Sequence, residues 1–187
     1  MFIQTEATPN PETLKFLPGK VVMERGVLDY RSEDDFASSP LAVRLFNVEG
    51  VSGVFLGYDF ISVSKDGTPW EHLKPAVLGA IMEHYLSGDP VVDNPDDAPL
   101  ESDEEEFDEA DAVTVAMIKE ILDERVRPAV AGDGGDIVFR SYKDGVVHLS
   151  MRGACAGCPS STMTLQMGIQ NLLRHFIPEV QEVRPVM

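Results

Sequence analysis

The sequence has few cysteines and few basic residues, and each shortage excludes a class of protein. Its 187 residues contain only two cysteines, Cys155 and Cys158, which is too few for the disulfide framework of a small secreted domain. Lys and Arg number 15 against 32 Asp and Glu, which gives a formal net charge of −17. A surface this acidic repels phosphate groups, so neither nucleic acid nor an anionic membrane is an expected partner.

Targeting and membrane signals are also missing. Every apolar run is interrupted by charge or proline within about ten residues, which is too short to cross a bilayer. The first residues, 1–6, lack the basic start and apolar core of a secretory signal, and they lack the Arg-rich character of a transit peptide. With the low cysteine count, this predicts a reducing compartment, namely a bacterial cytoplasm. The alternative is the mitochondrial matrix, for a processed form of the chain.

The absence of basic residues in one long stretch divides the chain. No Lys or Arg lies between Lys74 and Lys119, whereas twelve acidic residues and three prolines fall within positions 89–111. Like charges at this density repel one another, and the prolines oppose regular structure. The predicted organisation therefore has three parts: a first domain over 1–88, a flexible acidic linker over 89–109, and a second domain over 110–187.

The first domain shows mixed strand and helix patterns without a chemical motif. Strands are expected over 2–7, 13–17, 53–57 and 60–65. Helices are expected to begin at Ser39-Pro40 and at Thr68-Pro69, where a hydroxyl precedes a proline. The domain has no cysteine and no glycine-rich loop of the phosphate-binding kind. Its apolar residues are therefore interpreted as core.

The second domain is predicted to have the order α-β-β-α-β, with a three-stranded sheet and helices packed on one face. The expected elements are a helix from Ala112 that ends near Arg127-Pro128, strands over 136–142 and 146–152, a helix after Pro159, and a last strand over 180–186. Lys143-Asp144-Gly145 is the expected turn between the first two strands. The fold class of the whole chain is therefore α+β.

Cys155 and Cys158 fall between a predicted strand and a predicted helix. Two cysteines placed at random would show this spacing in roughly one chain in a hundred, so the pair is a candidate site. Free amides and the positive end of the helix dipole favour the thiolate form, which is the form that binds metal. Gly153 and Gly157 would let the backbone come close to bound sulfur.

Two thiolates are too few for a zinc ion or an iron–sulfur cluster. His175 is expected about 24 Å away along the last helix, and His148 about 20 Å away along the preceding strand. The remaining candidates are His72 and His84 in the first domain, and Asp133 and Asp136, whose oxygens are second choice for a soft metal. Two chains that give two cysteines each would complete the Cys₄ set of a [4Fe–4S] or [2Fe–2S] cluster.

Several motifs carry a resemblance to a known family. The segment Gly153–Ser161, with Ala131–Asp136 before it and Thr164-Leu165 and Gly168-Ile169 after it, resembles the C-terminal domain of NifU-like (Nfu) iron–sulfur proteins. The motifs Thr8–Pro11, Thr13–Phe16, Gly50-Val51, Asp59–Ile61 and Trp70–Val77 are similar to the N-terminal domain that accompanies it in one branch. The resemblance covers nearly the whole chain except the acidic linker. The additional cysteine-bearing [2Fe–2S] region of full-length NifU relatives is absent here.

The resemblance implies a non-enzymatic scaffold or carrier with Cys155 and Cys158 as ligands. It would hold one cluster, usually [4Fe–4S], between the subunits of a homodimer, and pass it to apo-proteins. Upstream cluster-assembly proteins would supply the cluster, and the first domain, which lacks ligands, is expected to recognise partners.

Three alternatives stay open from the residues alone. The first is a thiol–disulfide oxidoreductase that uses the same Cys-x-x-Cys motif. The second is a zinc-bridged dimer, and the third is an interaction module with incidental cysteines. The stretch Asp133–Asp136 has two interpretations as well: a tight turn capped by Asp136, or a segment that approaches the cysteine loop.

Overall fold

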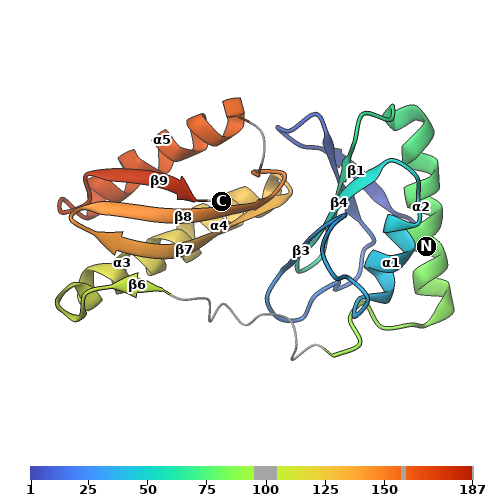
Figure 1. Cartoon of the computed structure of the whole chain (residues 1–187), viewed down its shortest axis with the longest axis horizontal. Coiled ribbons are helices and arrows are strands. Elements are labelled where there is room, and N and C mark those ends of the chain that lie inside the picture. The colour runs from blue at the N-terminus through green and yellow to red at the C-terminus, as the bar shows by residue number, and fades with distance from the viewer. Residues whose placement is uncertain (95–104, 157–158, 187) are drawn as a thin grey trace. The chain divides into compact units, whose positions relative to one another are not determined.

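The computed structural model describes residues 1–94, 105–156 and 159–186. The chain divides into two compact units, Met1–Leu100 and Glu101–Met187, and each unit combines helices with a sheet (Figure 1). The predicted α+β class with two small domains is therefore confirmed. Within the described ranges, no helix is both long enough and apolar enough to span a membrane.

The first unit is a five-stranded antiparallel sheet with two helices on one face (Figure 1). Its elements are β1 (Gln4–Ala7), β2 (Thr13–Leu17), β3 (Leu28–Arg31), α1 (Pro40–Phe46), β4 (Val51–Leu56), β5 (Ile61–Lys65) and α2 (Trp70–Ser87), and the strand order is β1-β2-β5-β4-β3. Ser39 caps α1 as predicted, because its Oγ accepts a hydrogen bond from the Ala42 amide at 3.2 Å. Strand β3 was not predicted.

The beginning of the expected linker is part of the first unit, which corrects the prediction for residues 89–93. The Ser39 hydroxyl donates to the Val91 carbonyl at 2.7 Å, and the Asp93 amide donates to the Ser38 carbonyl at 2.8 Å. Val92 is buried in the core of the unit. Burial of its apolar side chain and these hydrogen bonds fix a segment that charge and proline content alone would leave extended. Residues 95–104 of the expected linker lie outside the described residues.

The second unit contains a four-stranded sheet instead of the predicted three strands. Its elements are β6 (Glu106–Phe107), a 3₁₀ turn (Glu109–Asp111), α3 (Ala112–Ile121), a π-helical turn (Leu122–Val126), α4 (Arg127–Gly132), β7 (Gly135–Lys143), β8 (Val146–Gly153), α5 (Pro159–Phe176) and β9 (Glu182–Val186). The strand order is β6-β7-β8-β9. The added strand β6 pairs with β7 in parallel and comes from the end of the segment expected to be linker. The predicted hairpin and last strand are confirmed.

The helical path also runs further than predicted, past Pro128 to Gly132. A proline in a helix removes one backbone donor, and its ring needs space against the preceding turn. Here the π-helical turn Leu122–Val126 directly precedes α4, and Pro128 occupies the first turn of α4. The wider turn accommodates the proline. As a consequence, Arg127 is placed beside the start of β7.

Candidate functional site

Cys155 lies where the sequence predicts, between the end of β8 at Gly153 and the start of α5 at Pro159. Its side chain is 7 % exposed and belongs to the hydrophobic core of the second unit. Cys158 lies outside the described residues, so the geometry of the pair is not defined. The ligand role of both cysteines stays a prediction.

Three hydrogen bonds fix the backbone around Cys155. The Ala154 amide donates to the Gly134 carbonyl at 3.2 Å, and the Ala156 amide donates to the Gly153 carbonyl at 3.1 Å. From the other side, the Thr162 hydroxyl in the first turns of α5 donates to the Cys155 carbonyl at 3.1 Å. The loop is therefore tied to both elements that flank it and to the turn before β7.

The turn before β7 comes very close to the cysteine. Gly135 pairs with Gly153 in the β7–β8 ladder. A Cβ atom at position 135 would lie 2.7 Å from the Cys155 sulfur and 2.7 Å from the Arg152 carbonyl oxygen, and both distances are shorter than van der Waals contact allows. Gly153 has a φ of 64°, a conformation that favours glycine. Both interpretations of Asp133–Asp136 are met in part: a turn runs through Asp133 and Gly134, whose φ is 81°, and Gly135 approaches the cysteine loop.

Asp136 is the buried partner of an arginine and not a turn cap. The Arg127 Nε donates to Asp136 Oδ1 at 3.0 Å, and Nη2 donates to Oδ2 at 2.9 Å. A third nitrogen, Nη1, donates to Asp123 at 3.2 Å. Both oxygens of Asp136 are thus engaged by a guanidinium, which competes with a metal ion for this carboxylate.

The other candidate ligands are dispersed. His148 lies within β8, and its Nδ1 is 3.0 Å from the Ser141 hydroxyl. His175 lies in the last turn of α5, and His72 and His84 belong to α2 of the first unit. Among the described residues, no group of three or more His, Cys, Asp or Glu side chains is arranged to hold a metal ion. The described part of a single chain therefore provides no complete ligand set.

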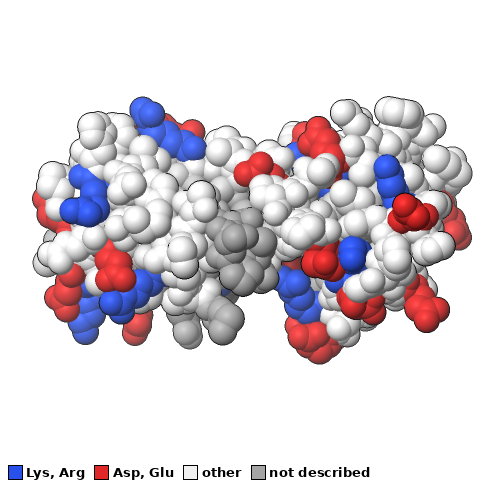
Figure 2. Space-filling view, turned by 90° about the horizontal axis from the view of Figure 1, so that it is seen from above, with Lys and Arg blue, Asp and Glu red and all other residues white. Residues whose placement is uncertain are grey.

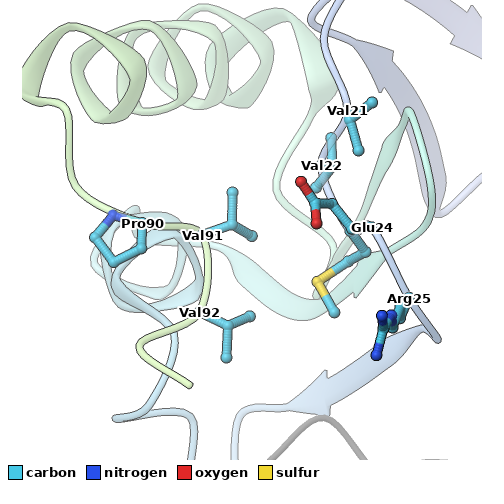
Figure 3. A pocket seen from close by; sticks show the side chains of 8 residues that line it. Val21, Val22, Glu24, Arg25, Pro90, Val91 and Val92 are labelled. Carbon is cyan, nitrogen blue, oxygen red and sulfur yellow. The ribbon is translucent and has the colours of Figure 1, made fainter. Parts of the chain in front are cut away.

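The first unit has a hollow of about 220 Å³ between two chain segments (Figure 3). It is lined by Val21, Val22, Met23, Glu24, Arg25, Pro90, Val91 and Val92. The lining is mainly aliphatic and contains no cysteine, histidine or hydroxyl group. Its two charged residues, Glu24 and Arg25, are of opposite sign, and the other lining residues are apolar.

Two family models match the chain. The model described as "Scaffold protein Nfu/NifU N terminal" matches residues 3–88, and the model described as "NifU-like domain" matches residues 118–184. A relative from Drosophila sechellia is 52 % identical over 188 residues and a human relative is 48 % identical over 190 residues; each match covers 100 % of this chain. Both relatives are named "NFU1 iron-sulfur cluster scaffold homolog, mitochondrial". A solved NifU-like protein from Saccharomyces cerevisiae is 29 % identical with a TM-score of 0.45, covering 49 % of this chain and 84 % of that one.

Together, the two domain matches define the class of this protein. It is a scaffold protein with an Nfu-type first domain and a NifU-like second domain. The chain belongs to the Nfu/NifU family of iron–sulfur cluster scaffold proteins, which confirms the resemblance drawn from the motifs. It spans 65 % of the length of the Drosophila relative and 72 % of the human one. The expected bacterial cytoplasm is wrong by this comparison, because both relatives are named mitochondrial.

Proposed function

We propose that this chain carries an iron–sulfur cluster between two copies of itself and delivers it to apo-proteins. Cys155 and Cys158 of each copy supply the ligands, and the cargo is a [4Fe–4S] cluster, with [2Fe–2S] as the alternative. The observation that carries the proposal is the ligand deficit. The chain has two cysteines in all, and its described residues contain no further cluster of metal-binding side chains.

Because Cys155 is buried, we expect the cysteine loop to change its conformation when the cluster binds. A thiol that is 7 % exposed is protected from oxidants but also from metal. Cluster binding therefore requires the Cys155 side chain to turn out of the core, away from Gly135. Three hydrogen bonds keep the backbone of the loop in place while the sulfur moves. They involve the Ala154 amide, the Ala156 amide and the Cys155 carbonyl.

Delivery proceeds by ligand exchange at the interface between the two copies. Thiolates of the recipient replace Cys155 and Cys158 one at a time, so no free cluster is released. A carrier of this kind binds and releases its cargo without converting a substrate, so it is not an enzyme. Its partners are apo iron–sulfur proteins downstream and cluster-assembly proteins upstream.

The first unit is proposed to recognise these partners. It has its own hydrophobic core, separate from that of the second unit, and none of its described residues forms a metal site. A chain that begins at Glu101 retains the complete core of the second unit. It is expected to bind the cluster normally and to deliver it more slowly. Unchanged delivery to every recipient tested would contradict this role.

The central test is anaerobic reconstitution of the full chain with iron and sulfide. The expected product is brown, contains about four irons for each two chains and elutes as a dimer on gel filtration. Cys155→Ser and Cys158→Ser are each expected to abolish the stable cluster. A Cys158→Ser variant that keeps its cluster and its transfer activity would refute the proposal. A colourless dimer that contains zinc would favour the zinc-bridged alternative.

The second candidate function is thiol–disulfide exchange, which the position of the Cys-x-x-Cys motif at the start of α5 favours. The same experiment separates the two functions. A chain that takes up no iron but cycles between a dithiol and a disulfide at a defined potential would be an oxidoreductase.

A further inference from the structure

Helix α5 presents large apolar side chains to solvent directly after the cysteine motif. Its inner side contributes Ile169 and Leu173 to the core of the second unit. On the outer side, Met163 is 67 % exposed and Met167 is 50 % exposed. These two methionines are four residues apart, so they lie next to each other on one face of the helix. Together they give this side of the helix an apolar surface that a protein partner can cover.

The same helix lies in a stretch without acidic residues. No Asp or Glu occurs between Asp144 and Glu179, although the chain holds 32 acidic residues. Figure 2, which looks at the molecule from above, shows that the visible surface of the second unit is largely uncharged, with scattered charged groups. Two copies of a chain with a net charge of −17 repel each other. A contact centred on α5, which carries no carboxylate side chain, avoids opposing carboxylates at the shortest distances.

Gly168 gives a further observation on the exposed side of α5. A glycine inside a helix costs about 1 kcal/mol relative to alanine. A Cβ atom at position 168 would have no neighbouring atom within 4 Å, so the fold of the chain gives no steric reason for glycine here. Gly168 is exposed, and it lies about 100° around the helix from Met167, at the edge of the face that the methionines form. A missing side chain at such a position allows the backbone of another helix to come close.

We infer that the face of α5 formed by Met163 and Met167, with Gly168 at its edge, is the surface through which two copies of the chain pair; it is here called the α5 face. The inference rests on the proposed function, because it is the shared cluster that requires a second copy. Helix α5 begins at the residue after Cys158. A two-fold axis that joins the two cysteine motifs therefore also brings the first turns of the two α5 helices together.

The test uses acidic substitutions with a matched control. Met163→Glu with Met167→Glu places carboxylates on the α5 face. Val113→Glu with Met117→Glu makes the same change on α3, where the two residues are also exposed and four apart. Both full-length variants and the wild type are reconstituted anaerobically with iron and sulfide. Light scattering after gel filtration gives the mass, iron analysis gives the content, and circular dichroism verifies folding.

The α5 variant is expected to dimerise at least about tenfold more weakly than the wild type, because like charges at a contact oppose association. Its iron content for each chain should fall in parallel, while the α3 control should match the wild type. Gly168→Leu gives a second test, because leucine is the better helix former. The apo chain should keep or gain thermal stability, whereas the cluster-loaded pair should weaken.

These experiments distinguish failure of this inference from failure of the proposed function. A wild type that takes up no cluster removes the proposed function and this inference with it. A wild type that forms a cluster-bridged pair, together with an α5 variant that pairs equally well, overturns the inference alone. Equal pairing combined with a specific loss of delivery also overturns it, and assigns the α5 face to a recipient protein.

Discussion

The Arg127 guanidinium donates to both carboxylate oxygens of Asp136, at 3.0 and 2.9 Å. Asp136 is the second residue of β7, next to Gly135, where an added Cβ atom would lie 2.7 Å from the Cys155 sulfur. The ion pair therefore connects α4 to the strand end that lies behind the cysteine. The turn at Gly134 makes a second connection to the cysteine loop, because its carbonyl accepts a hydrogen bond from the Ala154 amide.

Arg127→Gln should destabilise the second unit and weaken its hold on the cluster. The substitution leaves the buried carboxylate of Asp136 without its charged partner, which costs about 3 kcal/mol when the pair is buried. The Arg127 side chain is 27 % exposed, so the free energy of unfolding should fall by this amount or less. Calorimetry should show a lower unfolding temperature for one of two transitions, and reconstitution should give less iron.

Arg184→Gln is the control for this prediction, because the Arg184–Glu182 pair lies at the surface. Surface pairs add little to stability, so this variant should unfold and bind iron like the wild type. Equal losses in the two variants would show that the position of the Arg127–Asp136 pair has no special importance.

Gly135→Ala should disturb the cysteine loop directly. The new methyl group would lie 2.7 Å from the Cys155 sulfur and from the Arg152 carbonyl oxygen. Relief of such a contact requires backbone shifts that typically cost about 1–3 kcal/mol. Thermal unfolding and iron content should both fall. Gly132→Ala is the matched control, since a Cβ atom there meets nothing within 4 Å, and its iron content should stay at the wild-type level.

The features that the sequence predicts well are those with a local signal. Ser39-Pro40 marks the start of α1 because a hydroxyl cap and a proline suit the first turn of a helix. The β7–β8 hairpin follows from alternating apolar residues around Asp144-Gly145, and both of these residues have a positive φ. The position of Cys155 between strand and helix follows from the same local patterns.

The features that the sequence does not reveal depend on contacts between distant residues. Nothing in the pattern around Arg127 indicates that it pairs with Asp136, because a nine-residue separation across a turn matches no helical or strand period. Charge and proline content alone predict a linker at residues 89–93 and at β6. Each is fixed by a partner elsewhere in the chain, Ser39 for Val91 and β7 for β6.

Ser39→Ala should weaken the attachment of residues 89–93 to the rest of the first unit. The Ser39 Oγ caps α1 by accepting from the Ala42 amide, and it donates to the Val91 carbonyl at 2.7 Å. Loss of a helix cap costs about 1 kcal/mol, and Val91 loses its hydrogen bond as well. Hydrogen exchange of the Asp93 amide should accelerate, since its acceptor is the neighbouring Ser38 carbonyl. Ser32→Ala, at an exposed site, should leave this exchange rate unchanged.

His84 should make the stability of the first unit depend on pH. The imidazole is fully buried, and neither ring nitrogen has a hydrogen-bond partner among the described residues. Burial lowers the pKa of His84, and the nearby Arg44 lowers it further, while Asp89 opposes the shift. The folded state therefore prefers the neutral ring, whereas the unfolded state takes up a proton near its ordinary value of about 6.5. The contribution of this group to stability is complete above that pH and is lost as the pH falls below it.

The single tryptophan of the chain, Trp70, lies in α2, so its fluorescence reports on the first unit. Urea unfolding at pH 7.5 and at pH 5.5 should show a lower midpoint at the acidic pH, with a slope of at most about 1.4 kcal/mol for each pH unit, the limit for one proton. His84→Leu should flatten this dependence, because it removes the buried titrating group. His72→Leu, at an exposed position of the same helix, should retain it. A dependence that persists in His84→Leu would show that other groups in this unit cause it.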